Sequence, residues 1–227
     1  MDTEKLIRNT TLLLCFIAGF CDTLTFVAAG ELFSAHVTGN FIVFAYDIIK
    51  HANAYGWQKL LTFPVFVLAV MLGGWLAKQW ANMYLLLIME GILLFVSGLL
   101  AIGLTDGQET GWQAQLIALI IVVAMAFQNT FGKLYNKATY GLTTVMTGNV
   151  TQASLDFIKY FTSPADAATW ISFKKQATLI TGFLLGCLAG ALMAKHFGLI
   201  SVLLPAALML VWLAANKMFG KNIALGA

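Results

Sequence analysis

The chain has 227 residues, of which 60% are hydrophobic and only 10% are charged, and its mean hydropathy is +0.84. A soluble domain carries roughly 25% charged residues, so this composition excludes the soluble class and predicts a protein that spans a lipid bilayer. The net charge of +3 is small and scattered along the chain, which argues against nucleic acid as a partner. We therefore expect one transmembrane domain over residues 1–227.

Six apolar runs are long enough to cross a bilayer as helices, because a hydrocarbon core of ~30 Å requires about 20 residues. They extend over approximately 9–29, 60–78, 83–104, 114–132, 176–194 and 199–216. The first run follows Lys5 and Arg8, as in a signal peptide, but it is long enough to span and has no cleavage site of small residues before a soluble sequence. We expect it to be the first transmembrane helix.

Two segments between these runs, 32–49 and 140–161, are shorter or more polar than their neighbours and carry the same motif. After Thr38-Gly39-Asn40 come six residues and then Asp47-Ile48-Ile49-Lys50; after Thr147-Gly148-Asn149 come six residues and then Asp156-Phe157-Ile158-Lys159. The shared tail at the same spacing, roughly half the chain apart, indicates internal duplication. We expect one repeat over about 1–110 and a second over about 111–227.

The two motif segments decide how the repeats are related. If they enter the membrane without crossing it, each repeat has three spanning helices and the second is inverted; if they cross, the repeats are parallel. With the N-terminus inside, the distribution of Lys and Arg favours inversion by a single residue, and the acidic loop 105–113 falls outside. We therefore predict an all-α polytopic membrane protein with six spanning helices plus two short broken or re-entrant helices, built from two inverted repeats. Parallel repeats are the alternative.

The motif places Thr-Gly-Asn at the start of a helical stretch in both copies, Thr38-Gly39-Asn40 and Thr147-Gly148-Asn149. Threonine and asparagine favour helix N-caps, and glycine leaves the backbone accessible. A helix N-terminus carries unpaired N–H groups and about half a positive charge. Two such ends at membrane depth would form a substrate-binding site for an anion or another solute with hydrogen-bond acceptors. The alternative is a capped interfacial helix without a ligand.

Asp47 and Asp156 are candidates for ion or proton coupling. Each follows the asparagine of its motif by seven residues, about 20° short of two helical turns, so the two side chains share a helix face. However, Asp47 lies roughly 13 Å along the helix from Thr38 and reaches the interface if Thr38 is at the midplane. There we expect Asp47 to pair with Lys50 and Asp156 with Lys159 as interfacial anchors.

Asp22 and Glu90 are acidic residues inside two of the apolar runs. An ionisable side chain at such depth costs about 2.5–3.5 kcal/mol on insertion scales, so it usually faces the bundle interior and is functional. Gln128 and Asn129 lie at a matching depth in the second repeat. We expect these four residues to face a common interior, with Asp22 and Glu90 in proton coupling and Gln128 and Asn129 in substrate binding. His36, two residues before Thr38, is expected near the mouth of the substrate-binding site. The alternative role for the four interior residues is hydrogen bonding between helices.

Small residues recur every fourth position in two helices, at Gly182, Gly186 and Gly190 and at Ala69, Gly73 and Ala77. Such faces let helix backbones approach closely in lipid, so we interpret them as packing surfaces that permit a homodimer without requiring one. The three cysteines and three histidines are scattered, so we expect neither a metal nor another cofactor. The chain also lacks a catalytic set, which indicates that it is not an enzyme.

Four short motifs resemble those of a known family. They are Ala18-Gly19-Phe20-Cys21-Asp22, His36-Val37-Thr38-Gly39-Asn40, Ala126-Phe127-Gln128-Asn129 and Met146-Thr147-Gly148-Asn149. In this order they resemble the YoaK-like family of uncharacterised bacterial membrane proteins, except that Cys21 replaces a small aliphatic residue. The resemblance implies a multi-pass fold in the bacterial inner membrane and supplies no substrate.

Together these patterns predict a secondary transporter or channel for a small polar or anionic solute, with its site where the two repeats meet. The expected partners are the lipid bilayer and this solute, and the N-terminus is expected to be cytoplasmic. The alternative function is a non-transporting membrane scaffold or regulatory protein.

Overall fold

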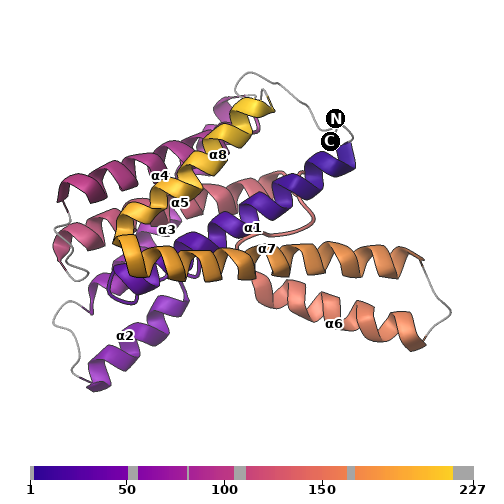
Figure 1. Ribbon diagram of the computed structural model, residues 1–227, viewed down its shortest axis with the longest axis horizontal. Coiled ribbons are helices and arrows are strands. Elements are labelled where there is room, and N and C mark those ends of the chain that lie inside the picture. The colour runs from indigo at the N-terminus through magenta and orange to yellow at the C-terminus, as the bar shows by residue number, and fades with distance from the viewer. Residues whose placement is uncertain (1–2, 51–55, 81, 105–110, 163–166, 217–227) are drawn as a thin grey trace.

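The computed structural model describes residues 3–50, 56–80, 82–104, 111–162 and 167–216, and these residues form helices without a β-strand. The elements are α1 (Thr3–Ala28), α2 (Gly39–Lys50), α3 (Gln58–Gln79), α4 (Leu85–Leu104), α5 (Trp112–Leu134), α6 (Met146–Thr162), α7 (Ala167–Phe197), the 3₁₀-helix η1 (Gly198–Val202) and α8 (Leu203–Ala215). Figure 1 shows most of them lying side by side in an elongated bundle.

Five stretches in the described part of the chain are long and apolar enough to span a membrane: α1, α3, α4, α5 and the 49-residue stretch Ala167–Ala215. The last stretch is not straight, because Gly198 has a φ of 55° and the chain turns through η1 before α8 runs back (Figure 1). Glycine adopts a positive φ without the steric cost that other residues meet, so Gly198 suits this reversal. The expected all-helical fold is confirmed for the described residues, and five apolar stretches, against the six expected, are compatible with a membrane protein.

Helix α7 begins nine residues before the apolar run that was expected to define it, at Ala167 instead of 176. Its first turns are held by aromatic contacts with α6. The ring centroids of Tyr160 in α6 and Trp170 in α7 are 4.9 Å apart, and those of Phe157 in α6 and Phe173 in α7 are 5.6 Å apart. These contacts stabilise a helix beyond the span of apolar residues, where hydropathy alone ends it.

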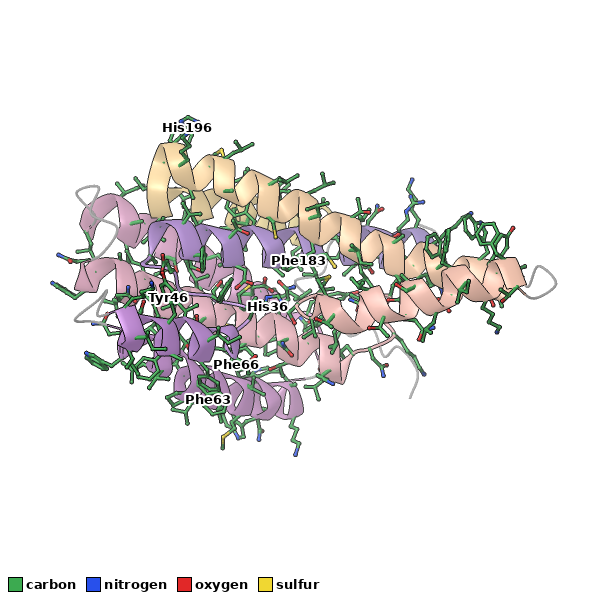
Figure 2. The ribbon with its side chains drawn as sticks, turned by 90° about the horizontal axis from the view of Figure 1, so that it is seen from below. His36, Tyr46, Phe63, Phe66, Phe183 and His196 are labelled. Atoms are coloured by element: carbon green, nitrogen blue, oxygen red, sulfur yellow. The ribbon has the colours of Figure 1, made fainter. Side chains whose placement is uncertain are left out.

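Helices α2 and α6, which carry the repeated motif, begin in the middle of the bundle and run toward opposite ends of it (Figures 1 and 2). The ion pairs of Lys59 locate α2 independently of the figures. Lys59 Nζ, at the start of α3, lies 2.5 Å from Asp47 of α2 and 3.8 Å from Glu31, which follows α1. The end of α1, the second half of α2 and the start of α3 therefore lie at the same end of the bundle.

The central helices are α1 and α5, whose apolar windows are both 67% buried, compared with 17% for α3. Helix α1 packs along α7, whereas α5 packs against α3 and α4. The glycine face of α7 makes the first contact close: a Cβ at Gly190 would lie 2.6 Å from the carbonyl oxygen of Phe20. On the surface, α3 exposes large apolar side chains such as Leu68 and Met71, as expected for a helix that contacts lipid.

Candidate functional site

Asp22 lies near the end of α1 and is only 4% exposed. Its Oδ1 accepts hydrogen bonds from the backbone N–H groups of Ala35, at 2.7 Å, and His36, at 3.2 Å. Its Oδ2 lies 2.5 Å from Nδ1 of the His36 ring. A buried carboxylate is costly unless hydrogen bonds and a partner compensate it, and here one segment supplies all three contacts. Asp22 thereby fixes the non-helical backbone that connects α1 to α2.

His36 is the accessible member of this pair, with 38% of its side chain exposed. Its ring meets Phe183 of α7 edge to face, with centroids 5.6 Å apart. Figure 2 shows both residues near the middle of the molecule. An imidazole beside a carboxylate can take up or release a proton near neutral pH, and its exposed edge leaves a route for that proton. The pair is chemically suited to coupling proton movement to another event.

Asn40 fastens the start of α2 to its surroundings and is completely buried. Its Oδ1 accepts from the backbone N–H of Phe33 at 2.8 Å, and its Nδ2 donates to the Phe33 carbonyl at 2.8 Å and to Thr62 Oγ1 of α3 at 3.0 Å. The Nδ2 hydrogens are thus used within the protein. Thr38, by contrast, is exposed, and Gly39 packs close to the Phe33 ring. Asn40 consequently positions the motif, while Thr38 remains accessible.

The second repeat makes corresponding contacts before α6. Asn149 Nδ2 donates to the carbonyl of Leu142, seven residues earlier, at 3.0 Å, the same separation as between Asn40 and Phe33. Thr147 and Gly148, which lie inside the first turn of α6, are exposed. The repeated motif is therefore repeated in its hydrogen bonding as well as in its sequence.

Two amides of α5 hold the segment before α6 in place, as Asp22 of α1 holds the segment before α2. Gln128 Nε2 donates to Thr143 Oγ1 at 2.8 Å and to the carbonyl of Leu14 in α1 at 2.9 Å. Asn129 Nδ2 donates to Thr144 Oγ1 at 2.8 Å. In each half, polar side chains of the first helix thus bind the irregular segment that follows it.

Asp22, Glu90 and Gln128 are buried and Asn129 is half-buried, but they do not form one contact cluster. Gln128 donates a hydrogen bond to the carbonyl oxygen of Leu14, and Leu14 is eight residues, or about 12 Å, from Asp22 along α1. Glu90 is 0% exposed, and neither of its carboxylate oxygens has a hydrogen-bond partner among the described residues. Glu90 lies within electrostatic range of Cys21 of α1, the residue before Asp22, so Glu90 is near this part of α1.

The acids at the ends of the motifs have different partners from those expected. Asp47 pairs with Lys59, and both are buried, at 4% and 3% exposure, because α2 packs its Asn40–Asp47 face against α3. The expected partner, Lys50, is exposed. Asp156 Oδ1 accepts from Gln152 Nε2 one turn earlier, at 2.7 Å, in place of the expected Lys159. Residues four apart on a helix are neighbours, so the Gln152 contact follows from helix geometry.

Sequence reasoning named Asp22 and His36 separately and missed that they bind each other. It also missed Phe33 and Lys59. The available signal was the short stretch after Gly30, where Ser34 and Ala35 interrupt the apolar pattern. The backbone N–H groups of a buried non-helical segment need hydrogen-bond acceptors. The carboxylate of an acidic residue in a neighbouring helix can be that acceptor.

Comparison with known proteins places the chain in a family. The sequence profile described as "Protein of unknown function (DUF1275)" matches residues 10–215, so the chain belongs to this family. This agrees with the resemblance to the YoaK-like membrane proteins. No curated protein and no solved structure matches the chain.

Proposed function

We propose that this member of the DUF1275 family is a secondary transporter or channel for a small polar or anionic solute, and that it is not an enzyme. One observation carries the proposal: the buried Asp22 binds the non-helical backbone of Ala35 and His36 in the middle of an apolar helical bundle. Within a membrane, irregular backbone is tolerated only where protein covers it or where it lines a water-filled cavity. Transporters place such segments at their solute sites.

The proposal includes two inverted repeats, about 1–110 and 111–227, with α2 and α6 as short re-entrant helices. It is supported by Lys59, which joins Glu31 and Asp47 at one end of the bundle, so that α2 returns to the end where α1 finishes. It is further supported by the opposite directions of α2 and α6 (Figure 1). Counting α7 and the η1–α8 segment separately on either side of Gly198 gives six spans.

Within this arrangement, Thr38 and Thr147 are the side chains best placed to contact solute, because both are exposed at the start of a half-length helix. At the start of α2, the N–H groups of Gly39, Asn40 and Phe41 already donate to carbonyl oxygens three residues earlier. Gly148 is exposed in the first turn of α6, where a helix N-terminus favours an anion or a carboxylate. Asn40, Asn149, Gln128 and Asn129 hold the two sites in shape. The Asp22–His36 pair couples a proton to transport, with Glu90 as a second buried acid.

One cluster of basic residues and a further lysine support an orientation with the N-terminus in the cytoplasm of a bacterium. Lys5, Arg8, Lys174 and Lys175 line one hollow, and Lys78 lines another with Tyr135. Cytoplasmic ends of inner-membrane proteins are enriched in Lys and Arg. At the opposite end, Lys59 is neutralised by its ion pair with Asp47.

A cysteine-accessibility experiment tests for a water path without knowledge of the solute. Thr38→Cys and Thr147→Cys are placed in a Cys187→Ser background, since Cys15 and Cys21 are completely buried. A membrane-impermeant thiol reagent is then applied to right-side-out and inside-out vesicles. We expect both cysteines to react, whereas Leu68→Cys, on the lipid-exposed face of α3, does not. If Thr38→Cys and Thr147→Cys are as unreactive as Leu68→Cys from both sides, the transport proposal is wrong.

A flux measurement then tests the role of the threonines. Proteoliposomes are loaded with a pH-sensitive dye and challenged with a panel of small anions, including carboxylates, phosphate and sulfate. We expect Thr38→Val and Thr147→Val to reduce the flux of the responding anion more than they reduce thermal stability. Equal flux in these variants and in the wild type would remove the threonines from the site.

The second candidate function is a non-transporting membrane scaffold. It is favoured by Asn40, whose amide hydrogens are both used inside the protein, and by the close contact between α1 and α7. The unreactive outcome of the cysteine experiment would select it.

A further inference from the structure

A hollow of about 720 Å³ opens between the first turns of α1 and the first half of α7. Its mouth is basic: Lys5 and Arg8 come from α1, and Lys174 and Lys175 come from α7. In Figure 1 these two helices diverge toward the end of the bundle that holds the N-terminus. This hollow, called here the basic cleft, is remote from the Asp22–His36 pair, since Arg8 and Asp22 are fourteen residues, or about 21 Å, apart along α1.

Tyr140 forms one wall of the basic cleft. Its hydroxyl donates to Glu4 Oε1 at 2.7 Å, and Lys175 Nζ lies 5.2 Å from the centre of its ring. Burial and the hydrogen bond with Glu4 raise the pKa of Tyr140 to about 12, so its hydroxyl remains protonated and keeps donating to Glu4. Glu4 is the acidic residue that lines the cleft, against four cations. The cleft is therefore positively charged and suited to an anion.

The basic cleft also has apolar side chains further into the bundle than its cations. Leu12 lies one turn beyond Arg8 in α1, and Ala177 follows Lys174 and Lys175 in α7. From Lys174 to Thr181 the cleft extends over seven residues of α7, or about 10 Å. A small inorganic anion uses only the charged mouth, whereas an amphipathic molecule also covers the apolar wall. Basic pockets between helices at the cytoplasmic side of a membrane are suited to anionic lipid headgroups.

We propose that the basic cleft binds an anionic phospholipid. Its phosphodiester lies between Arg8 of α1 and Lys174 and Lys175 of α7, and an acyl chain lies along Leu12 and Ala177. Charge complementarity selects an anionic lipid over a zwitterionic one, because the four cations exceed the single carboxylate. The bound lipid bridges the two helices where they diverge, beyond the contact between Leu12 and Gly182.

The test measures thermal unfolding of the full chain in a neutral detergent after addition of lipid. Dioleoyl phosphatidylglycerol is compared with dioleoyl phosphatidylcholine, and glycerol 3-phosphate and inorganic phosphate are tested separately as soluble phosphates. We expect phosphatidylglycerol to raise the unfolding temperature and the other three to have little effect. In Arg8→Gln/Lys175→Gln the concentration needed for half of the effect rises about tenfold, because two charge-assisted contacts are lost. Arg8→Lys/Lys175→Arg, which keeps both charges, retains most of the response.

Lys195→Gln is the matched control, because it removes an exposed cation at the other end of α7. It is expected to respond like the wild type. Native mass spectrometry of the same samples counts retained phosphatidylglycerol and gives a readout that does not depend on stability. An equal response to phosphatidylcholine, or an unchanged response in Arg8→Gln/Lys175→Gln, overturns the proposal. If the soluble phosphates stabilise the protein as well as the lipid does, the cleft is a soluble-anion site and the lipid assignment is wrong.

Discussion

Asn40 and Asn149, which lie roughly half the chain apart, make the same contact: each side-chain amide donates to the backbone carbonyl seven residues before it. Their partners, Phe33 and Leu142, belong to the irregular segments that precede α2 and α6. The asparagine of the repeated motif therefore closes a loop of fixed length in both halves. This gives the repeated motif a physical reason, because a helix that starts inside a bundle needs its preceding backbone held by the protein.

The two asparagines are expected to differ in their contribution to stability. Asn40→Ala leaves the buried N–H and carbonyl of Phe33 without partners, at a cost of about 1–3 kcal/mol. Asn149 is half-buried, and water can replace part of its contact, so Asn149→Ala is expected to cost about 1 kcal/mol or less. Denaturant unfolding in detergent, followed by circular dichroism, measures both. A greater loss for Asn149→Ala would contradict the burial argument.

The buried pair of Asp47 and Lys59 is expected to show strong coupling. Removing one partner leaves an uncompensated buried charge, so Lys59→Met alone is expected to cost about 3–5 kcal/mol. The double variant Asp47→Leu/Lys59→Met removes both charges and is expected to recover most of that loss. A double-mutant cycle on unfolding free energies measures the coupling. Lys50→Met, which changes an exposed cation on α2, is the control and is expected to have almost no effect. Additive single effects would show that the pair contributes nothing.

The re-entrant path of α2 is tested by labelling engineered cysteines from each side of the membrane. Glu31→Cys and Lys50→Cys are expected to react from the same side, because Lys59 brings the end of α1 and the second half of α2 together. Lys159→Cys, near the end of α6, is expected to react from the opposite side. Labelling of positions 31 and 50 from opposite sides would mean that α2 crosses the membrane and that the repeats are parallel.

The contact between α1 and α7 is expected to be intolerant of even one methyl group. A Cβ at Gly186 would clash with the backbone carbonyl oxygen of Phe16, which cannot move without displacing α1. Overpacking of this kind costs about 1–3 kcal/mol, and we expect Gly186→Ala to lower the unfolding temperature in detergent. Gly74→Ala is the matched control, because a Cβ there has nothing within 4 Å, and it is expected to be neutral or slightly stabilising. Equal stability of the two variants would show that the helices separate at no cost.

Hydropathy predicted α3, α4 and α5 well, because their ends coincide with the ends of apolar runs. Helices α3, α4 and α5 begin and end within about two residues of the apolar runs 60–78, 83–104 and 114–132 that predicted them. It failed for the start of α7, where Trp170 and Phe173 continue the helix through contacts with α6. A helix held by packing beyond its apolar run leaves no signal in hydropathy.

The candidate site was predicted in its residues but not in its pairings. Spacing rules reach only the neighbours on one helix, so they assigned Lys50 to Asp47, whereas the partner is Lys59 from the following helix. The same spacing rules could not predict the contact between Asp22 and His36. That contact depends on the path of the segment between the two residues, which brings His36 back beside α1. Such distances are set by tertiary packing and not by periodicity.

The packing of α1, in the first half of the chain, against α7, in the second half, has a consequence for biosynthesis. Helix α1 is made first, yet the glycine face that covers it, on α7, is made only after most of the chain. Asp22 gains its hydrogen bonds earlier in synthesis, because its partners Ala35 and His36 belong to the segment that directly follows α1. The nascent chain thus carries one of its buried acids already paired, while the final closure of the bundle is postponed until α7 is complete. A chain that ends before α7 leaves α1 uncovered. A truncated chain therefore cannot complete the bundle, whereas a finished chain can.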